Sequence, residues 1–496
     1  MRIYSFVRKG LELVPIEVEI NLMAGTNQLQ IMGLPDTAIK ESGLRIKSAL
    51  KSQGFQWPAG QQILVNLRPS HWRKSSRGLE LAIACGYLWH SGQVAPPADL
   101  KDEAYVYGEL GLDGKVYAPG DLDSLFDHPE SIPIVTGKSR GPTQQRLLIL
   151  ESLSQVTEPY VQIPVEDQEE RFSDLPAIDE GRLVFPAQVG RLLSLVACGE
   201  HPTLLAGPAG SGKTTFAQAL HSLLPPPSPD QAREISRIRR WFNSPEESRR
   251  PFVCPHHTIP PMSMIGGGVP VFPGEITRAH GGLLVMDEFL EFHSQVKEAL
   301  REPLEGGEIV ISRKGQTQVL PARFHLLATT NLCHCGRLVP GKRMNCQYSL
   351  TRCRSYLEKM SGPLLDRFDV LAFSDSWVKG GGPLASKKKQ GLTLSLKQVG
   401  EQVQRVRAFQ MKRTGDPWPL PNGRTDGLQI AQSLDDFTRE NLLPSTEGSQ
   451  RRLRAMMRVA RTLADMDLAE QITTKHIDEA AQWAWQSFED LHRIFA

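Results

Sequence analysis

Three features are absent from this sequence. No apolar run approaches the roughly 20 residues that a helix needs to cross a membrane. The first segment, Met1 to Gly10, lacks the long apolar core of a secretory signal peptide. The seven cysteines are an odd number in a chain of 496 residues, which disfavours a framework of disulfide bonds. We therefore expect a cytoplasmic protein with no membrane partner.

The chain also lacks an excess of charge of either sign, because 57 Lys and Arg residues stand against 55 Asp and Glu residues. Nucleic-acid binding cannot be argued from a net charge of +2, so any basic surface must be local. Hydrophobic residues make up 40% and charged residues 23%, which is ordinary for a globular protein. A chain of this length exceeds one hydrophobic core and predicts several domains.

The clearest motif lies between Gly207 and Thr214, where Gly-Pro-Ala-Gly-Ser-Gly-Lys-Thr matches the phosphate-binding pattern G-x-x-x-x-G-K-T. An apolar run over 203–206 precedes it and a helical pattern over 214–224 follows, which is the context the pattern requires. Backbone amides and the helix N-terminus would face phosphate oxygens. Lys213 is expected at the β- and γ-phosphates, and Thr214 at Mg²⁺. The predicted nucleotide ligands of this motif are Gly207, Pro208, Ala209, Gly210, Ser211, Gly212, Lys213, Thr214 and Thr215.

A second apolar run, over 282–286, ends at the acidic pair Asp287 and Glu288. Downstream of a phosphate loop, a buried strand that ends in carboxylates is typical of a nucleotide-hydrolysis site. Asp287 would hold Mg²⁺ through water, and Glu288 would activate the attacking water as a general base. The alternative, an exposed acidic turn, is the weaker interpretation in this context.

Two further polar residues have the chemistry of phosphate sensing. Asn331 follows an expected strand over 324–328 and could sense the γ-phosphate. Arg367 suits an arginine finger, a bidentate cation that stabilises phosphate charge in the transition state. An arginine beside Asp366 and Asp369 suits a salt bridge as well, so both interpretations stay open.

Four cysteines fall close together in the sequence, at Cys333, Cys335, Cys346 and Cys353. Four thiolates can bind zinc tetrahedrally. The spacing is not the regular paired pattern of zinc sites, so free thiols in a basic loop are an equally good interpretation.

Residues 1 to about 165 carry no nucleotide signature and have the pattern of a mixed α/β domain. Apolar alternation predicts strands over 14–22 and 63–67, and helical patterns cover 37–52 and 79–88. Lys74, Ser75 and Ser76 could combine a nucleophile with a base. Adjacent polar residues before a helix are far more often a loop and an N-cap.

The order of these motifs resembles that of AAA+ ATPases, and more closely that of the magnesium-chelatase-like ComM/YifB family. The resemblance covers nearly the whole chain. The segments that carry it are 31–42, Pro255-His256-His257-Thr258, 266–268, 273–276, 279–282 and 361–367.

The resemblance implies an α/β fold with three folded parts. Residues 1–165 would form a ribosomal-S5-domain-2-like (Lon-protease-like) domain, without a recognisable protease dyad. After a linker over 166–181, residues 182–376 would form a P-loop AAA+ core with a parallel sheet and a candidate zinc-binding insertion over 333–353. A flexible linker over 377–397 would lead to a helical lid over 398–496.

The resemblance also implies a homo-hexameric ring that binds ATP and Mg²⁺ between subunits. Asn331 would be sensor 1, Arg367 the finger offered to a neighbour, and Arg451 the sensor 2 arginine. The partner would be branched DNA or a single-stranded/duplex junction, gripped near 266–268 and a hairpin at Lys314. The family is associated with branch migration in homologous recombination and natural transformation.

An alternative is a remodelling subunit of a protein or metal-chelatase complex that does not translocate DNA. This sequence also departs from the family pattern, because Tyr348 replaces the last cysteine of the second C-x-C pair. Cys353 is the candidate substitute, so zinc is in doubt.

Overall fold

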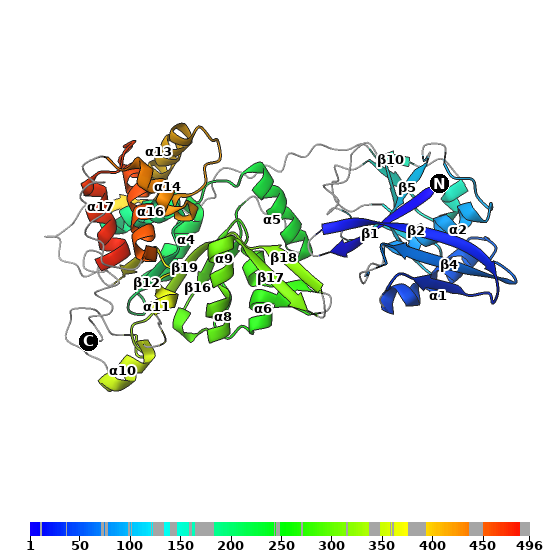
Figure 1. Cartoon of the computed structure of the whole chain (residues 1–496), viewed down its shortest axis with the longest axis horizontal. Coiled ribbons are helices and arrows are strands. Elements are labelled where there is room, and N and C mark those ends of the chain that lie inside the picture. The colour runs from blue at the N-terminus through cyan, green and yellow to red at the C-terminus, as the bar shows by residue number, and fades with distance from the viewer. Residues whose placement is uncertain are drawn as a thin grey trace. The chain divides into compact units, whose positions relative to one another are not determined.

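The computed structural model describes most of the chain, which divides into two compact units (Figure 1). The first unit comprises residues 1–171 with 237–245, and the second 172–236 with 246–496. The described residues are 1–9, 12–35, 37–70, 74, 78–97, 100, 102–120, 122, 133–138, 146–157, 161–163, 183–242, 244, 249–268, 271–313, 316–336, 348–357, 359, 362–374, 393–435 and 450–486. None of the described helices is long and apolar enough to cross a membrane.

The first unit is built on a mixed sheet of eight strands in the order β10-β9-β8-β5-β1-β2-β4-β3. The neighbours β1/β2, β2/β4 and β9/β10 are antiparallel and the other neighbours are parallel. The strands are β1 (Arg2–Lys9), β2 (Glu12–Ala24), β3 (Leu29–Met32), β4 (Gln61–Arg68), β5 (Glu103–Val106), β8 (Ile134–Thr136), β9 (Leu147–Ile149) and β10 (Val161–Ile163). The predicted strands over 14–22 and 63–67 lie inside β2 and β4.

Two helices, α1 (Thr37–Ser52) and α2 (Leu79–His90), complete the core of this unit. Ile63, Val65 and Leu67 alternate on β4 and are fully buried, as the period of two predicted. Residues 79–88 of α2 are buried on every side, which explains why its apolar pattern is continuous. The smaller elements are β6 (Glu109–Leu110), β7 (Val116–Tyr117) and the turn η2 (Leu153–Thr157).

Lys74 is buried in this unit, where its ammonium group bonds to backbone carbonyl oxygens. Its Nζ donates to the carbonyl oxygen of Gly33 at 2.8 Å and to that of Pro69. Burial lowers the pKa of Lys74. Ser75 and Ser76 lie outside the described residues, so the pairing of a nucleophile with a base is not tested.

The second unit contains a five-stranded parallel sheet in the order β13-β16-β19-β12-β20. The strands are β13 (Phe252–Val253), β16 (Leu283–Met286), β19 (His325–Thr330), β12 (Thr203–Ala206) and β20 (Val370–Phe373). The three central strands are buried along their whole length, which explains the apolar run in each, although β19 also contains His325, Thr329 and Thr330. The parallel sheet of the predicted α/β fold is therefore confirmed.

Helices and short insertions surround this sheet. The elements before β16 are β11 (Val184–Pro186), α3 (Ala187–Gly199), α4 (Lys213–Leu223), α5 (Pro229–Trp241), α6 (Pro261–Ile265), β14 (Gly266–Gly267), β15 (Phe272–Pro273) and α7 (Glu275–Arg278). Those after β16 are η3 (Phe289–Glu291), α8 (Ser294–Ala299), α9 (Arg301–Gly306), β17 (Glu308–Arg313), β18 (Gln316–Pro321), α10 (Leu350–Leu357) and α11 (Gly362–Leu365).

The structure contains both segments that the resemblance assigns to DNA contact. The glycine segment forms the β14–β15 pair, where a Cβ on Gly266 would lie 2.6 Å from the carbonyl oxygen of Phe272. The backbone therefore requires glycine at this position. The hairpin predicted around Lys314 and Gly315 is β17–β18, although these two residues lie outside the described ranges.

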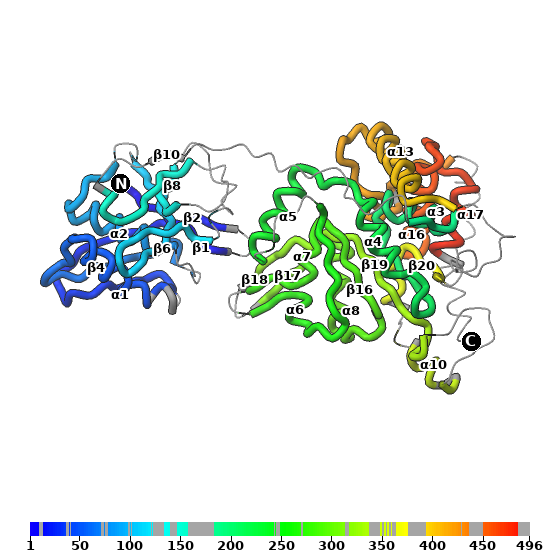
Figure 2. The backbone as a smooth tube through the Cα atoms, turned by 180° about the vertical axis from the view of Figure 1, so that it is seen from behind, coloured from blue at the N-terminus to red at the C-terminus, as the bar shows by residue number. Residues whose placement is uncertain are grey.

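C-terminal helices pack against the same sheet unit. These elements are β21 (Thr393–Ser395), α13 (Leu396–Thr414), η4 (Asn422–Arg424), α14 (Gly427–Ile430), η5 (Ala431–Ser433), α16 (Gln450–Met466), α17 (Thr474–Ala481) and η6 (Gln482–Gln486). Figure 2 shows α16 and α17 beside α3. Apolar residues of α3, α4, α13 and α16 share one core, so these helices are held to the sheet rather than free of it.

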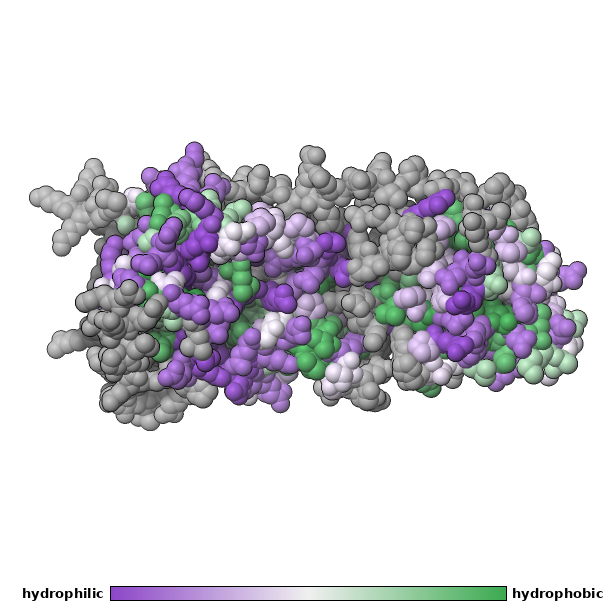
Figure 3. Space-filling view, turned by 45° about the horizontal axis from the view of Figure 1, so that its top comes forward, coloured by the Kyte–Doolittle hydropathy of each residue, from purple (hydrophilic) through white to green (hydrophobic). Residues whose placement is uncertain are grey.

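Figure 3 shows one face of the molecule, coloured by the hydropathy of the described residues. Hydrophilic and hydrophobic residues are interspersed there, in keeping with the near balance of charges in the sequence.

Candidate functional site

The phosphate-binding pattern forms a tight loop between the carboxyl end of β12 and the first turn of α4. Gly210 and Gly212 have φ values of +75° and +89°, a left-handed conformation that favours glycine. A Cβ on Gly207 would lie 2.1 Å from Oγ of Ser374, so a side chain at this position would displace the Ser374 hydroxyl. A hydrogen bond between the hydroxyl groups of Ser211 and Ser374, whose Oγ atoms are 2.5 Å apart, holds the Ser211 side chain.

Lys213 connects this loop to the neighbouring strand β19. Its Nζ donates to the carbonyl oxygens of Gly207 and Pro208, both at 2.9 Å, and to Oδ1 of Asn331 at 3.3 Å. Burial lowers the pKa of Lys213, while the nearby carboxylates of Asp287 and Glu288 oppose that change. The ammonium group therefore bonds to the loop and stays close to the acidic pair.

Asp287 and Glu288 follow β16 and lie beside the end of β19. Oδ1 of Asp287 accepts a hydrogen bond from the Thr329 hydroxyl, and the backbone amide of Glu288 donates to the same hydroxyl at 3.4 Å. Glu288 has φ 54° and ψ 47°, a left-handed conformation that costs on the order of 1 kcal/mol or more for a residue with a side chain. This backbone presents the Glu288 side chain to solvent at the carboxyl edge of the sheet, where 50% of it is exposed.

His257 contacts Glu288, and sequence reasoning assigned it no role. Nδ1 of His257 lies 3.2 Å from Oε2 of Glu288. The ring of His256 lies against that of His257, with 4.2 Å between the centroids. The signal in the sequence was the segment Pro255-His256-His257-Thr258, which carries part of the family resemblance, and the structure adds that His257 shortly follows β13, the strand that neighbours β16.

Mg²⁺ fits the residues predicted to hold it. Thr214 lies in the first turn of α4 with its side chain exposed, and Asp287 contributes a carboxylate at the same edge of the sheet. Hydroxyl and carboxylate oxygens are the ligands Mg²⁺ prefers beside phosphates. Thr215 is half-buried in the same helical turn.

Arg367 and Arg451 lie at the other edge of the sheet. Arg367 comes before the amino end of β20, whereas the phosphate loop follows the carboxyl end of the parallel strand β12. A four-residue strand of about 13 Å lies between these edges. Both arginines line a cavity of about 540 Å³.

That cavity is rich in charge. Burial lowers the pKa of Arg367, and the positive charges of Arg301 and Arg451 lower it further. Nη2 of Arg451 lies 3.2 Å from Oε1 of Glu305. The charged residues that line the cavity are Glu200, Glu305, Arg323, Asp366, Arg367, Asp369, Arg424, Arg451, Arg454 and Arg458.

The acidic neighbours of Arg367 contact other side chains. Asp366 accepts from Nε of Arg452 at 3.2 Å. Asp369 lies 3.3 Å from Nη1 of Arg458 and 3.1 Å from Nδ1 of His201. Asp366 and Asp369 therefore have contacts of their own, and the role of Arg367 as an arginine finger stays a prediction.

The described part of the cysteine cluster does not support zinc. The Sγ atoms of Cys333 and Cys335 are 2.9 Å apart, and Cys353 is buried on α10. Cys346 lies outside the described residues. Within the described ranges, no group of three His, Cys, Asp or Glu side chains is arranged to hold a metal ion. The turn that contains Cys333, Cys335 and Gly336 contacts the phosphate loop, because the backbone amide of Ala209 donates to the carbonyl oxygen of Gly336 at 3.2 Å.

A parallel sheet with a phosphate loop on β12, an acidic pair after β16 and a polar residue after β19 defines an AAA+-like protein. Family models agree with this class. The model for magnesium chelatase subunit ChlI matches residues 183–376, that for subunit ChlI of Mg-chelatase matches 18–121, and that for the ChlI C-terminal part matches 394–483.

Relatives of similar length make the assignment narrower. The uncharacterized protein YifB of Escherichia coli is 31% identical over 96% of this chain and 95% of its own length. The competence protein ComM of Haemophilus influenzae is 31% identical over 96% of both chains. An uncharacterized protein of Mycobacterium tuberculosis is 31% identical over 74% of this chain and 76% of its own. The chain belongs to the magnesium-chelatase-like ComM/YifB family.

Proposed function

We propose that this chain is a cytoplasmic ATPase that forms a homo-hexameric ring and moves branched DNA, promoting branch migration in homologous recombination and natural transformation. One observation supports the proposed ring. Arg367 and Arg451 lie at the edge of the sheet opposite the chain's own phosphate loop. A neighbouring subunit would place its phosphate loop against this cavity.

The proposed roles at the site follow from chemistry and position. The loop amides and Lys213 bind the β- and γ-phosphates, and Thr214 and Asp287 hold Mg²⁺, which neutralises phosphate charge. Glu288 takes the proton of the attacking water. Asn331 orients the γ-phosphate, while Arg367 and Arg451 from the neighbour stabilise charge in the transition state.

The DNA partner is proposed from the family and from two insertions. One is the β14–β15 segment at Gly266–Gly267 and the other is the β17–β18 hairpin around Lys314. Both would contact the DNA backbone without reading bases. The name of the Haemophilus influenzae relative, a competence protein, supports a role in natural transformation.

The domain assignment remains part of this proposal. Residues 1–165 are proposed to form a Lon-like domain, residues 182–376 the ATPase core, and residues 398–496 the lid, with linkers over 166–181 and 377–397. The matches to magnesium chelatase models over 183–376 and 394–483 support the core and the C-terminal part.

The test compares ATP hydrolysis by the full chain with and without a synthetic four-way DNA junction. We expect stimulation by junction DNA and strand exchange that requires ATP, with an ATP-free reaction as the control. Normal basal hydrolysis that DNA does not change would contradict the proposal. It would instead favour the second candidate, a remodelling subunit of a protein or metal-chelatase complex, which the ChlI matches support.

A further inference from the structure

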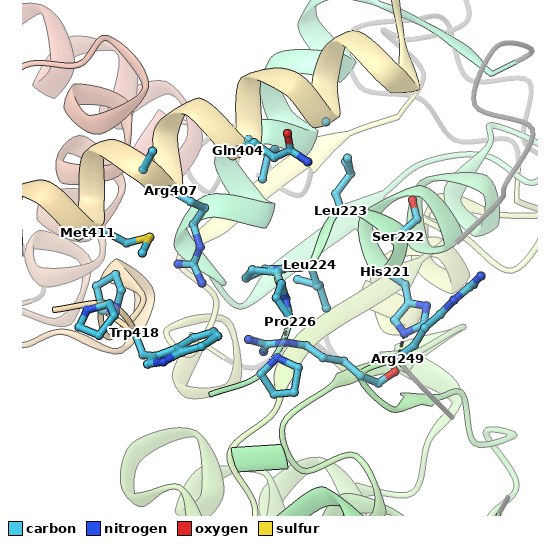
Figure 4. A pocket seen from close by; sticks show the side chains of 18 residues that line it. His221, Ser222, Leu223, Leu224, Pro226, Arg249, Gln404, Arg407, Met411 and Trp418 are labelled. Carbon is cyan, nitrogen blue, oxygen red and sulfur yellow. Dashed lines mark hydrogen bonds between the residues drawn. The ribbon is translucent and has the colours of Figure 1, made fainter. Parts of the chain in front are cut away.

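A second cavity, of about 440 Å³, lies in the sheet unit between the end of α4 and helix α13 (Figure 4). The Pro417–Pro419 loop forms its third side. None of the residues predicted to bind nucleotide or DNA lines this cavity. Its volume is in the range of pockets that hold small organic ligands.

The walls of this cavity are apolar and preformed. Leu223 and Leu224 at the end of α4 and Val403 on α13 are buried beneath it. Trp418 is 45% exposed and lies at the cavity opposite Leu224 (Figure 4). Prolines flank Trp418, and its backbone amide donates to Oδ1 of Asp416 at 2.8 Å, so the loop conformation is restrained.

The charge of the lining has one sign. Arg249, Arg250 and Arg407 line the cavity, and no Asp or Glu is among its lining residues. Arg250 has a buried partner, since its Nη1 lies 3.2 Å from Oε1 of Glu200.

Arg407 is the cation available to a ligand. It extends from α13 toward Trp418 (Figure 4), and its Nη1 donates to Oε1 of Gln410 at 3.3 Å. No carboxylate of the described residues lies within ion-pair distance of it. A half-buried guanidinium beside an apolar cavity favours an anionic ligand, because its charge is only partly compensated.

We propose that this cavity is a binding site for a small aromatic anion, a fused or substituted ring that bears a carboxylate or sulfonate. The ring packs on Trp418 and the leucines of α4, and the acidic group bonds to Arg407. Apolar area supplies most of the affinity, and the charged pair selects anions over neutral rings. Such a ligand would contact both α4, which begins at Lys213, and the C-terminal helix α13.

The probe is naphthalene-2-sulfonate, titrated calorimetrically into the full chain, with the neutral naphthalene-2-sulfonamide as the matched ligand. We expect saturable binding of the sulfonate and weaker binding of the sulfonamide. Arg407→Gln is expected to weaken sulfonate binding about tenfold and leave sulfonamide binding unchanged. Trp418→Leu is expected to weaken both.

Arg405→Gln is the control, because Arg405 is exposed on the same helix and does not line the cavity. The variants' melting temperatures report whether the fold is intact. Absence of saturable sulfonate binding, or equal affinity in wild type and both cavity variants, would overturn the proposal. An equal loss with Arg405→Gln would show general charge attraction and overturn it as well.

Discussion

Nδ1 of His257 lies 3.2 Å from Oε2 of Glu288. The proposed general base, Glu288, is therefore in contact with a residue of the loop that follows a neighbouring strand. His257 is separated by only a few residues from α6 and the β14–β15 insertion that is proposed to contact DNA. A movement of that insertion would therefore be transmitted to the carboxylate of Glu288 through one short loop. We therefore predict that His257 positions Glu288 for water activation.

His257→Ala is expected to lower kcat for ATP about tenfold to a hundredfold, because a misdirected carboxylate transfers a proton poorly. KM for ATP should change little, since His257 is not among the predicted phosphate ligands. His257→Asn supplies an amide N–H in place of the ring nitrogen and should retain more activity than the alanine variant. Steady-state kinetics with and without DNA measures both values.

His256→Ala serves as the control in the same loop, because Nδ1 of His256 lies 2.8 Å from Oγ1 of Thr258 and the ion-pair contact to Glu288 comes from His257. Equal losses in the His256 and His257 variants would indicate a general effect on the loop and count against a specific role.

Lys213→Ala is expected to weaken ATP binding about a hundredfold, since a charge-assisted contact to phosphate is lost. The thermal stabilisation that ATP gives the wild-type chain should disappear in this variant. Lys412→Ala is the control, because Lys412 is exposed on α13. If Lys213→Ala kept the full ATP-dependent shift in melting temperature, the phosphate loop would not be the nucleotide site.

The shared cavity of Arg367 and Arg451 gives the ring a test by mixing inactive variants. Lys213→Ala and Arg367→Ala should each be inactive alone. A Lys213→Ala subunit still offers Arg367 to the intact loop of an Arg367→Ala neighbour. Random one-to-one rings should recover up to about a quarter of wild-type hydrolysis, because one interface in four combines both intact halves.

Lys213→Ala mixed with Glu288→Gln is the matched control for this experiment. Both changes lie in the same half of the proposed site, so no interface becomes complete and no activity should return. Recovery in this control, or none with Arg367→Ala, would contradict a site shared between subunits.

Sequence patterns predicted the elements that are local in the chain. The phosphate loop, the acidic pair after β16 and the helix Thr37–Ser52 each depend on adjacent residues or a single period. The sheet order β13-β16-β19-β12-β20 does not follow the chain, and it is this order that brings His257 to Glu288. Arg367 and Arg451 meet only after the α16 helix packs against the sheet unit. Contacts between residues that lie so far apart in the chain cannot be predicted from the local patterns of one sequence.

Glu200 gives a prediction for stability and pH. Its carboxylate is buried between the guanidinium groups of Arg250 and Arg424, at 3.2 Å and 3.1 Å. Burial alone would raise the pKa of Glu200, but the two arginines outweigh it and lower the pKa to about 2. Because the folded pKa is below the unfolded one, this stabilisation is present above about pH 4.5 and is lost as the pH falls toward 2.

Glu200→Gln is therefore expected to lower the free energy of unfolding by about 3 kcal/mol at pH 7. The difference between wild type and variant should shrink between pH 4.5 and pH 3.5, because the wild-type carboxylate loses its advantage there. Urea unfolding at pH 7, pH 4.5 and pH 3.5 measures this difference, with the exposed Glu401→Gln on α13 as the control. A difference that stays constant with pH would mean that Glu200 acts by packing, and that its ionisation contributes nothing.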